Sequence, residues 1–383
     1  MTAMTSPLLQ TARIDSSRQI LQLDWSDQTR SRLHALWLRD NCQGDCCRHP
    51  GNGQRLHTVL DLPAAVELAA VDLTAPDTLS VQFGPDGHNS RFSTDWLYTQ
   101  SCDSIPARES GWLADSIQVW DSRLQLARAS YPVIRQDNTA LAAWLTAIVR
   151  DGVAVLTDCP LESGTVAQVA SLFGYVRETN YGRWFDVRSE LNPVNLAYTG
   201  LGLQVHTDNP YRDPTPGLQL LHCLANDAEG GDSVVVDGFR AAQQLQSENA
   251  ADFALLSRYP IAFEYRSDKD WLRAETPMIE LGASGELRAV HFNNRSIAPL
   301  SLPCELMPDY YAAYRRFAEI LARPELSVCF KLAPGELFIV DNRRVLHGRT
   351  AFSGAGSRHL QGCYTDHDGL ASTLRMLRTS NSR

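Results

Sequence analysis

The sequence lacks the features that direct a protein to a nucleic acid or into a membrane. It has no uninterrupted apolar run of about 18 residues, and residues 1–15 lack the apolar core of a secretory signal. Basic residues are also scarce, because 35 Lys and Arg stand against 44 Asp and Glu, which gives a net charge of −9 and a pI near 5.6. We therefore expect a soluble, cytoplasmic protein without nucleic-acid or membrane partners.

A disulfide framework and a regular Cys-x-x-Cys pair are missing too. Nine cysteines, an odd number, are spread over 383 residues, which suits reduced thiols. Cys42, Cys46 and Cys47 nevertheless cluster, and together with the later His88 they would fill a closed tetrahedral zinc site that stabilises a small domain. The alternatives are free surface cysteines, since neighbours on a strand point apart, or another histidine as the fourth ligand, namely His34, His49 or His57.

The length of the chain predicts two domains, because 383 residues with 44% hydrophobic content exceed the usual size of one core. Residues 1–103 carry short strand-like runs and turn signals, which indicate a small β-rich domain. The irregular residues 104–130 are expected to form a linker that carries Trp112 and Trp120 for docking. Residues 131–383 then form the larger domain.

The larger domain is expected to be mainly β with helices, an α+β fold. Its many short strands with turn signals between them indicate a barrel or a sandwich. We expect helices at 138–148, 163–173, 239–257 and 307–323, and strands at 152–156, 195–198, 218–224, 233–236, 262–265, 289–292, 336–340 and 358–365. The last residues, 373–383, are expected to fray.

A short motif, His206-Thr-Asp208, has the spacing of two metal ligands. Residues two apart on a strand project to the same face, so His206 and Asp208 can bind one ion. A remote histidine, His347, would complete a set of two histidines and one carboxylate, which leaves three positions open and is typical of non-haem Fe(II) oxygenases. Because so short a motif often occurs by chance, its surroundings must support it.

Arg358 supplies that support. It follows His347 by eleven residues and begins an alternating run in which Arg358, Leu360, Gly362 and Tyr364 share one face of a strand. A buried arginine needs an anion, which is either a core acidic residue or a bound dicarboxylate co-substrate. Arg358 and Tyr364 would lie on opposite sides of the metal centre, because six residues of strand span at most ~20 Å.

Several longer segments resemble one known family. They are Leu36-Trp-Leu-Arg-Asp-Asn-Cys42, Val205-His-Thr-Asp-Asn-Pro210, Leu218-Gln-Leu-Leu-His-Cys223, Gly230-Gly-Asp-Ser233 and Ser357-Arg-His-Leu-Gln-Gly362. Together they look like the γ-butyrobetaine and trimethyllysine dioxygenases among the Fe(II)- and 2-oxoglutarate-dependent oxygenases. The resemblance implies a double-stranded β-helix (jelly-roll) domain, an N-terminal zinc domain, a homodimer, ascorbate as reductant, and hydroxylation of γ-butyrobetaine at C3 to L-carnitine.

The same resemblance assigns roles to individual residues. It implies iron ligands at His206, Asp208 and His347, and binding of the distal carboxylate of 2-oxoglutarate by Arg358. The zinc ligands Cys42, Cys47 and His88 match the family's pattern, whereas Gly44 occupies the place of its middle cysteine. Cys46 is the candidate that replaces the missing ligand.

A quaternary ammonium substrate would explain the aromatic residues, because a methylated cation is held against ring faces. The resemblance places Tyr181, Tyr198 and Tyr364 in an aromatic cage. Phe185 occupies the family's tryptophan position with Trp184 beside it, and either ring could face the substrate. The substrate carboxylate would contact Asn195, and a further contact could come from Asn293 or Asn294.

Three other functions remain open at this point. Trimethyllysine hydroxylation needs the same cation site but must also match an α-amino acid end. A taurine-type dioxygenase needs a cationic pocket rather than an aromatic cage. The third alternative is a non-catalytic, zinc-stabilised interaction protein, which the complete set of two histidines, aspartate and arginine argues against.

Overall fold

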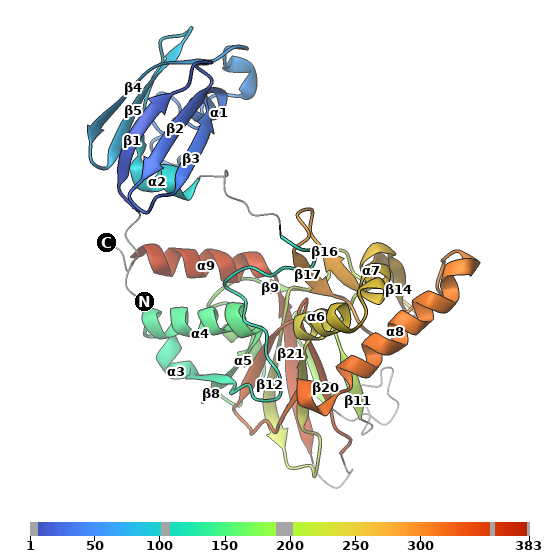
Figure 1. The fold of residues 1–383 in the computed structure, drawn as a ribbon. Helices are drawn as coiled ribbons and strands as arrows, with labels where there is room; N and C mark the ends of the chain where they lie inside the picture. The colour runs from blue at the N-terminus through green and yellow to red at the C-terminus, as the bar shows by residue number, and fades with distance from the viewer. Residues whose placement is uncertain (1–6, 101–107, 189–201, 353–356, 381–383) are drawn as a thin grey trace. The chain divides into compact units, whose positions relative to one another are not determined.

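The computed structural model describes residues 7–100, 108–188, 202–352 and 357–380 (Figure 1). Its contacts divide the chain into two compact units, Met1–Ala107 and Arg108–Arg383. Within the described residues, no helix is long and apolar enough to cross a membrane.

The N-terminal unit consists of two three-stranded antiparallel sheets. Alternating residues such as Leu21, Leu23 and Trp25 point into its core, as the two-residue period of a strand requires. The first sheet has the order β1 (Leu9–Ile14), β2 (Ile20–Trp25), β3 (Arg30–His34), and the second β4 (Glu67–Ala75), β5 (Thr78–Gly84), β6 (Asn89–Ser93). Between residues 7 and 100, the structure adds three short helices to the sheets: α1 (Ala35–Asp40), η1 (Val59–Asp61) and α2 (Thr94–Thr99). The expected small β-rich domain is confirmed.

The second unit contains two larger sheets. The main sheet has the order β10 (Phe185–Arg188), β21 (Arg358–Thr365), β12 (Leu218–Asn226), β19 (Leu337–Asp341), β8 (Val153–Thr157), β7 (Ala127–Ser130), and β9 (Val176–Arg177) also pairs with β21. The minor sheet has the order β11 (Leu203–His206), β20 (Val345–Arg349), β13 (Ser233–Asp237), β18 (Ser327–Phe330).

The two sheets pack face to face. Leu221, Phe338 and Leu360 of the main sheet share one apolar cluster with Val235 and Val345 of the minor sheet. Nearly all pairs are antiparallel, and the order of strands crosses between distant parts of the chain. This arrangement is the expected double-stranded β-helix within an α+β unit.

Helices cover the outer face of the main sheet. The buried side chains of Trp144, Val166 and Leu374 pack with Leu220 and Ile339 of the sheet. These helices are α3 (Tyr131–Ile134), α4 (Asn138–Asp151), α5 (Thr165–Ala170) and α9 (His367–Ser380). The expectation that residues 373–383 fray is therefore wrong as far as Ser380, because the apolar stripe of α9 packs onto this layer.

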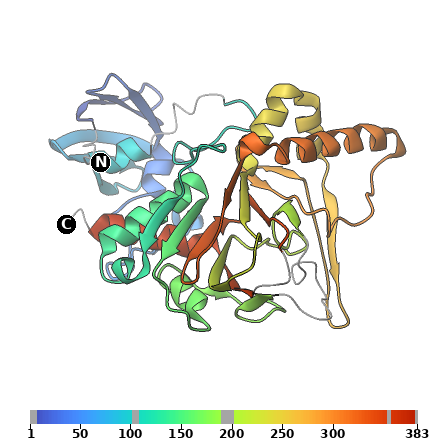
Figure 2. The ribbon, with the colours of Figure 1, turned by 90° about the horizontal axis from the view of Figure 1, so that it is seen from below.

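A second group of helices borders the minor sheet, where α6, α7 and α8 lie together (Figure 2). They are α6 (Gly238–Glu248), α7 (Ala250–Arg258) and α8 (Met307–Leu321), with η3 (Cys304–Leu306), η4 (Pro324–Leu326) and the hairpins β14 (Ile261–Arg266)–β15 (Trp271–Thr276) and β16 (Ile279–Leu281)–β17 (Leu287–Val290) beside them. The single helix expected at 239–257 is two helices. Asn249 separates them, because its backbone is extended and its side chain accepts hydrogen bonds from the backbone N–H groups of Ala251 and Asp252.

Residues 108–130 belong by their contacts to the second unit, and a buried ion pair anchors them. Arg344 and Asp237 are almost fully buried, with 2.8 Å between Nη2 and Oδ2. Arg344 also donates to the carbonyl oxygen of Gln118, and the backbone N–H of Trp120 donates to Asp237. The indole of Trp120 donates to the carbonyl oxygen of Asp151 at 2.6 Å. These contacts satisfy both buried charges and fasten the segment to β13 and α4.

Asp237→Ala should therefore destabilise the second unit strongly. Removing one partner leaves a buried guanidinium without its carboxylate, which costs roughly 3–5 kcal/mol. Urea unfolding followed by tryptophan fluorescence measures the change. The control is Asp121→Ala, which removes a surface pair with the exposed Arg123 and should leave the midpoint nearly unchanged. Equal midpoints for the two variants would contradict the anchoring role of Asp237.

Candidate active site

Strand pairing brings the three candidate metal ligands together. His206 at the end of β11 is the register partner of His347 on β20, and Asp208 follows two residues after His206. The Nε2 atoms of His206 and His347 lie 3.3 Å and 4.0 Å from Asp208 Oδ1. One ligand atom from each residue falls within 4.8 Å of the others. Three ligands from two distant parts of the chain thus converge on one point.

The protonation of these groups suits a divalent metal. Burial opposes the charge of Asp208, but hydrogen bonding, with His206 and with Tyr364, outweighs it and holds the pKa of Asp208 well below its usual range. Burial, with His206 beside it, lowers the pKa of His347 to about 3, so His347 is neutral. His206 Nδ1 donates to the carbonyl oxygen of Gln204 at 2.8 Å, so Nε2, which faces Asp208 Oδ1, is the nitrogen that a metal would bind in place of a proton. Two imidazoles and a carboxylate fit Fe(II).

The backbone of Asp208 is fixed by Asn342, a residue that sequence reasoning did not assign. The fully buried Asn342 follows β19, accepts from the backbone N–H of Asp208 at 2.7 Å and donates to its carbonyl oxygen at 2.9 Å. The same amide donates to the carbonyl oxygen of Pro216. Nothing in the local sequence around Asn342 indicates this role, because its partner lies far away in the chain.

A pocket surrounds the metal ligands and has a cationic end. Arg358 and Arg349 line it, and both are buried. Arg358 Nε donates to the carbonyl oxygen of Gly231 at 3.2 Å, and a Cβ at residue 231 would lie only 3.1 Å from that nitrogen. Burial lowers the pKa of Arg358, and burial together with Arg358 lowers the pKa of Arg349 to about 10. Two guanidiniums in one buried region favour a bound anion.

Arg349 was missing from the sequence-based set, although a signal for it existed. It follows His347 by two residues on β20, so strand periodicity places both side chains on the same face. Across the strands it pairs with Leu203 and Ser233, which also line the pocket.

The other end of the pocket is aromatic. The ring centroids of Tyr364 and Phe185 lie 5.2 Å apart, and those of Phe185 and Tyr181 lie 6.0 Å apart. Phe185 pairs across the strands with Gly362, and a Cβ there would lie 2.6 Å from the Phe185 ring. Gly362 is therefore the residue that admits the ring. Tyr211, which donates from its hydroxyl group to Asn209, stands next to Tyr181 with 3.1 Å between the hydroxyl oxygens.

The remaining candidate substrate contacts have different positions. Trp184 points away from the pocket and packs near Gly164, whereas its neighbour Phe185 lines the pocket, because adjacent residues point to opposite sides of an extended chain. Asn293 donates to the carbonyl oxygen of Thr207 and Asn294 to the side chain of Gln204, so neither amide is directed to the pocket. Asn195 and Tyr198 lie outside the described residues.

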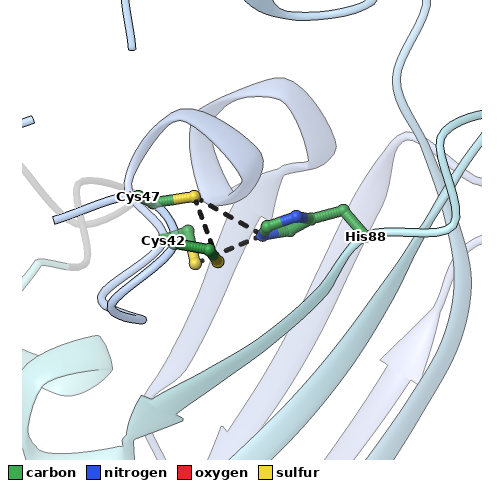
Figure 3. A group of neighbouring side chains, drawn as sticks. Cys42, Cys47 and His88 are labelled. Atoms are coloured by element: carbon green, nitrogen blue, oxygen red, sulfur yellow. Dashed lines mark hydrogen bonds between the residues drawn. The ribbon is translucent and has the colours of Figure 1, made fainter. Parts of the chain in front are cut away.

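The N-terminal unit contains the second cluster of metal-binding side chains. Cys42, Cys47 and His88 point toward one another (Figure 3). His88 Nε2 lies 3.3 Å from Cys42 Sγ and 3.7 Å from Cys47 Sγ, and the Sγ atoms of Cys46 and Cys47 are 3.8 Å apart. Tetrahedral Zn–S bonds of about 2.3 Å would separate two sulfurs by ~3.8 Å, so the cluster fits zinc. A Cβ at Gly44 would lie 3.7 Å from Cys46 Sγ.

Comparison with known proteins places the chain in a class. A family model described as "Taurine catabolism dioxygenase TauD, TfdA family" matches residues 119–364, and the model "Gamma-butyrobetaine hydroxylase-like, N-terminal" matches residues 12–98. The chain belongs to the TauD/TfdA family of dioxygenases. The double-stranded β-helix and the site of two histidines and an aspartate fit the 2-oxoglutarate-dependent chemistry of this class.

Within this class, the chain is similar to γ-butyrobetaine dioxygenases and to trimethyllysine dioxygenases. It is 37% identical to the γ-butyrobetaine dioxygenase of Pseudomonas sp. (strain AK-1), over 98% of this chain and 97% of that protein. The human γ-butyrobetaine dioxygenase is 32% identical, with 97% of each chain covered. The mitochondrial trimethyllysine dioxygenase of Mus musculus is 31% identical, over 91% of this chain and 83% of that protein. The expected family relationship is confirmed.

One solved structure is a taurine dioxygenase from Burkholderia xenovorans. It matches with a TM-score of 0.49 and 17% identity, over 65% of this chain and 93% of that one.

Asp208→Ala should abolish tight metal binding. The variant loses the only carboxylate among the three ligands, and we expect Mn(II) affinity to fall at least ~100-fold, beyond the 10–100-fold typical of outer partners. Electron paramagnetic resonance of free Mn(II) measures it. Asp186→Ala is the control, because Asp186 pairs with His359 outside the ligand group and should bind Mn(II) normally. Unchanged binding by Asp208→Ala would refute the metal assignment.

Proposed function

We propose that the protein hydroxylates γ-butyrobetaine at C3 to form L-carnitine, with O2 and 2-oxoglutarate consumed and succinate and CO2 released. The observation that carries the proposal is the aromatic wall of Tyr181, Phe185 and Tyr364 in the same pocket as the metal ligands. A trimethylammonium group has no N–H to donate, and ring faces bind it with about 0.5–2 kcal/mol each. The named γ-butyrobetaine dioxygenase relatives support the same substrate.

In this proposal His206, Asp208 and His347 hold Fe(II). When bound, the iron supplies the activation of O2, the oxidative decarboxylation of 2-oxoglutarate and the hydroxylation of the substrate carbon. Arg358 binds the distal carboxylate of 2-oxoglutarate, since its buried guanidinium needs an anion and lies at the cationic end of the pocket. The proposed reductant, ascorbate, remains a prediction.

In this proposal the substrate is oriented mainly by its cationic end. Burial, with Asp208 next, raises the pKa of Tyr364 well above its usual range, and burial likewise raises that of Tyr181. Both phenols therefore stay neutral and present ring faces to the cation. Asn195 and Tyr198 are proposed to complete the substrate site. Fixing the cation against the rings determines which carbon faces the metal, and thus the position of hydroxylation.

Succinate formation with different substrates tests the proposal. We expect γ-butyrobetaine to stimulate 2-oxoglutarate turnover more than trimethyllysine or taurine, and nuclear magnetic resonance should identify L-carnitine as the product. Greater stimulation by trimethyllysine would assign the sister activity, which the relatives of that name also support. Stimulation by taurine alone would overturn the cation site.

Phe185→Leu should raise the KM for γ-butyrobetaine about 5–30-fold, because it removes one face worth ~1–2 kcal/mol from the cation site. The matched control is Trp184→Leu, which changes the neighbouring ring that lies outside the pocket and should leave the KM within about twofold. Steady-state kinetics at saturating 2-oxoglutarate measure both. A larger effect at Trp184 than at Phe185 would contradict the proposed cage.

We also propose a structural zinc ion bound by Cys42, Cys46, Cys47 and His88, a homodimer and a cytoplasmic location. The zinc proposal is supported by the distances within the cluster and by the proximity of Cys46 Sγ to the site that a cysteine side chain at residue 44 would enter. His34 is already engaged as the cap of α1, where it accepts from the backbone N–H of Leu36.

Cys46→Ala should therefore lower the zinc content of the purified protein and the thermal midpoint of the N-terminal unit. Adding Gly44→Cys to that variant should restore both, because the new thiol would approach the same cluster. Mass spectrometry of the metal content and calorimetry measure the two quantities. Cys304→Ala, at an exposed cysteine outside the cluster, is the control. Full zinc retention by Cys46→Ala would exclude Cys46 as a ligand.

A further inference from the structure

The two oxygens of Asp208 have different surroundings. Oδ1 faces the Nε2 atoms of His206 and His347 at 3.3 Å and 4.0 Å. Oδ2 instead accepts two hydrogen bonds, from Gln219 Nε2 at 2.6 Å and from the Tyr364 hydroxyl group at 2.7 Å. The carboxylate is thus divided between a metal-facing oxygen and an oxygen that is already occupied by donors.

The side chain of Gln219 is buried next to this carboxylate and donates its hydrogen bond to it. It lies on β12 between β19 and β21, is the register partner of Tyr364, lines the pocket and is only 3% exposed. The orientation of its amide follows from chemistry, because an ionised carboxylate only accepts and must face the NH2 group. Its Oε1 is buried and has no hydrogen-bond partner among the described residues.

We propose that Gln219 is a positioning residue that keeps Asp208 bound to the metal through Oδ1 alone. A carboxylate can bind a metal through one oxygen or through both, and the second mode would occupy a further coordination position. The two histidines and one aspartate oxygen leave three positions, which a bidentate keto acid and O2 together require. By engaging Oδ2, Gln219 preserves the position that 2-oxoglutarate and O2 need.

Tyr364 donates to the same oxygen but has a second role. Its ring also forms part of the aromatic wall with Phe185, so a change at Tyr364 affects metal and substrate together. Gln219 has no aromatic ring, and its amide group donates to Asp208. A change at Gln219 therefore affects the positioning of the metal ligand without removing a ring that binds the substrate. The inference rests on the proposed metal site but not on the identity of the substrate.

Gln219→Leu tests the inference, because leucine is of similar size, is tolerated in a buried position and lacks the amide donor. Mn(II) binding is measured by electron paramagnetic resonance, and binding of 2-oxoglutarate to the Mn(II)-loaded protein by calorimetry. We expect Mn(II) affinity to fall about tenfold, as for other groups that orient a ligand, and 2-oxoglutarate affinity to fall several-fold further. The KM for γ-butyrobetaine should stay within about twofold in Gln219→Leu but rise in Tyr364→Phe through altered ring placement.

Gln361→Leu provides the matched control. Gln361 is an equally buried glutamine on the neighbouring β21, but its amide bonds Ser163, Gly164 and Asp186 rather than Asp208. It should lose stability and keep its affinity for Mn(II) and 2-oxoglutarate. Equal affinities in wild type and Gln219→Leu, or equal losses in Gln219→Leu and Gln361→Leu, would overturn the positioning role alone. Failure of the wild-type protein to bind Mn(II) would overturn the proposed metal site itself.

Discussion

The antiparallel pairing of β11 with β20 is the constraint on which the rest of the site depends. It sets His206 opposite His347, and a shift of one residue would turn one imidazole out of the pocket. The same pairing explains why the buried charge of Asp208 is tolerated. Two imidazoles, a glutamine amide and a phenol surround a carboxylate that burial alone would neutralise.

A charged and an aromatic side chain are separated along β21, and in the proposed function this separation orders the two ligands. Arg358 begins the strand and Tyr364 lies near its end, and both line the pocket that also contains His206, Asp208 and His347. A dicarboxylate is favoured at the first end and a methylated cation at the second. In the proposed function, the distance of a substrate carbon from the cationic group then determines which carbon lies nearest the metal.

The parts of the site that the sequence predicts are those with short, local spacing. His206 and Asp208 are two residues apart, and Arg358 shares a strand face with Tyr364, so the period of a strand is sufficient to group them. Residues such as Gln219 and Asn342 were missed because they contact Asp208 only after remote strands pair. The fold shows the same limit.

The β-rich character of both units followed from turn signals and alternation, whereas several short strands, among them β11 and β20, and the ends of helices did not. A helix cap by Asn249 divides one apolar stripe into two helices, and the packing of α9 stabilises a segment that its position in the chain alone suggested would fray.

The most direct measurement of the central claim is a crystal structure with Mn(II), 2-oxoglutarate and γ-butyrobetaine, in which turnover is blocked. Manganese bound to His206, Asp208 and His347, with the trimethylammonium group against Tyr181, Phe185 and Tyr364, is the predicted result. A trimethylammonium group at the arginine end, or manganese bound elsewhere, would contradict it.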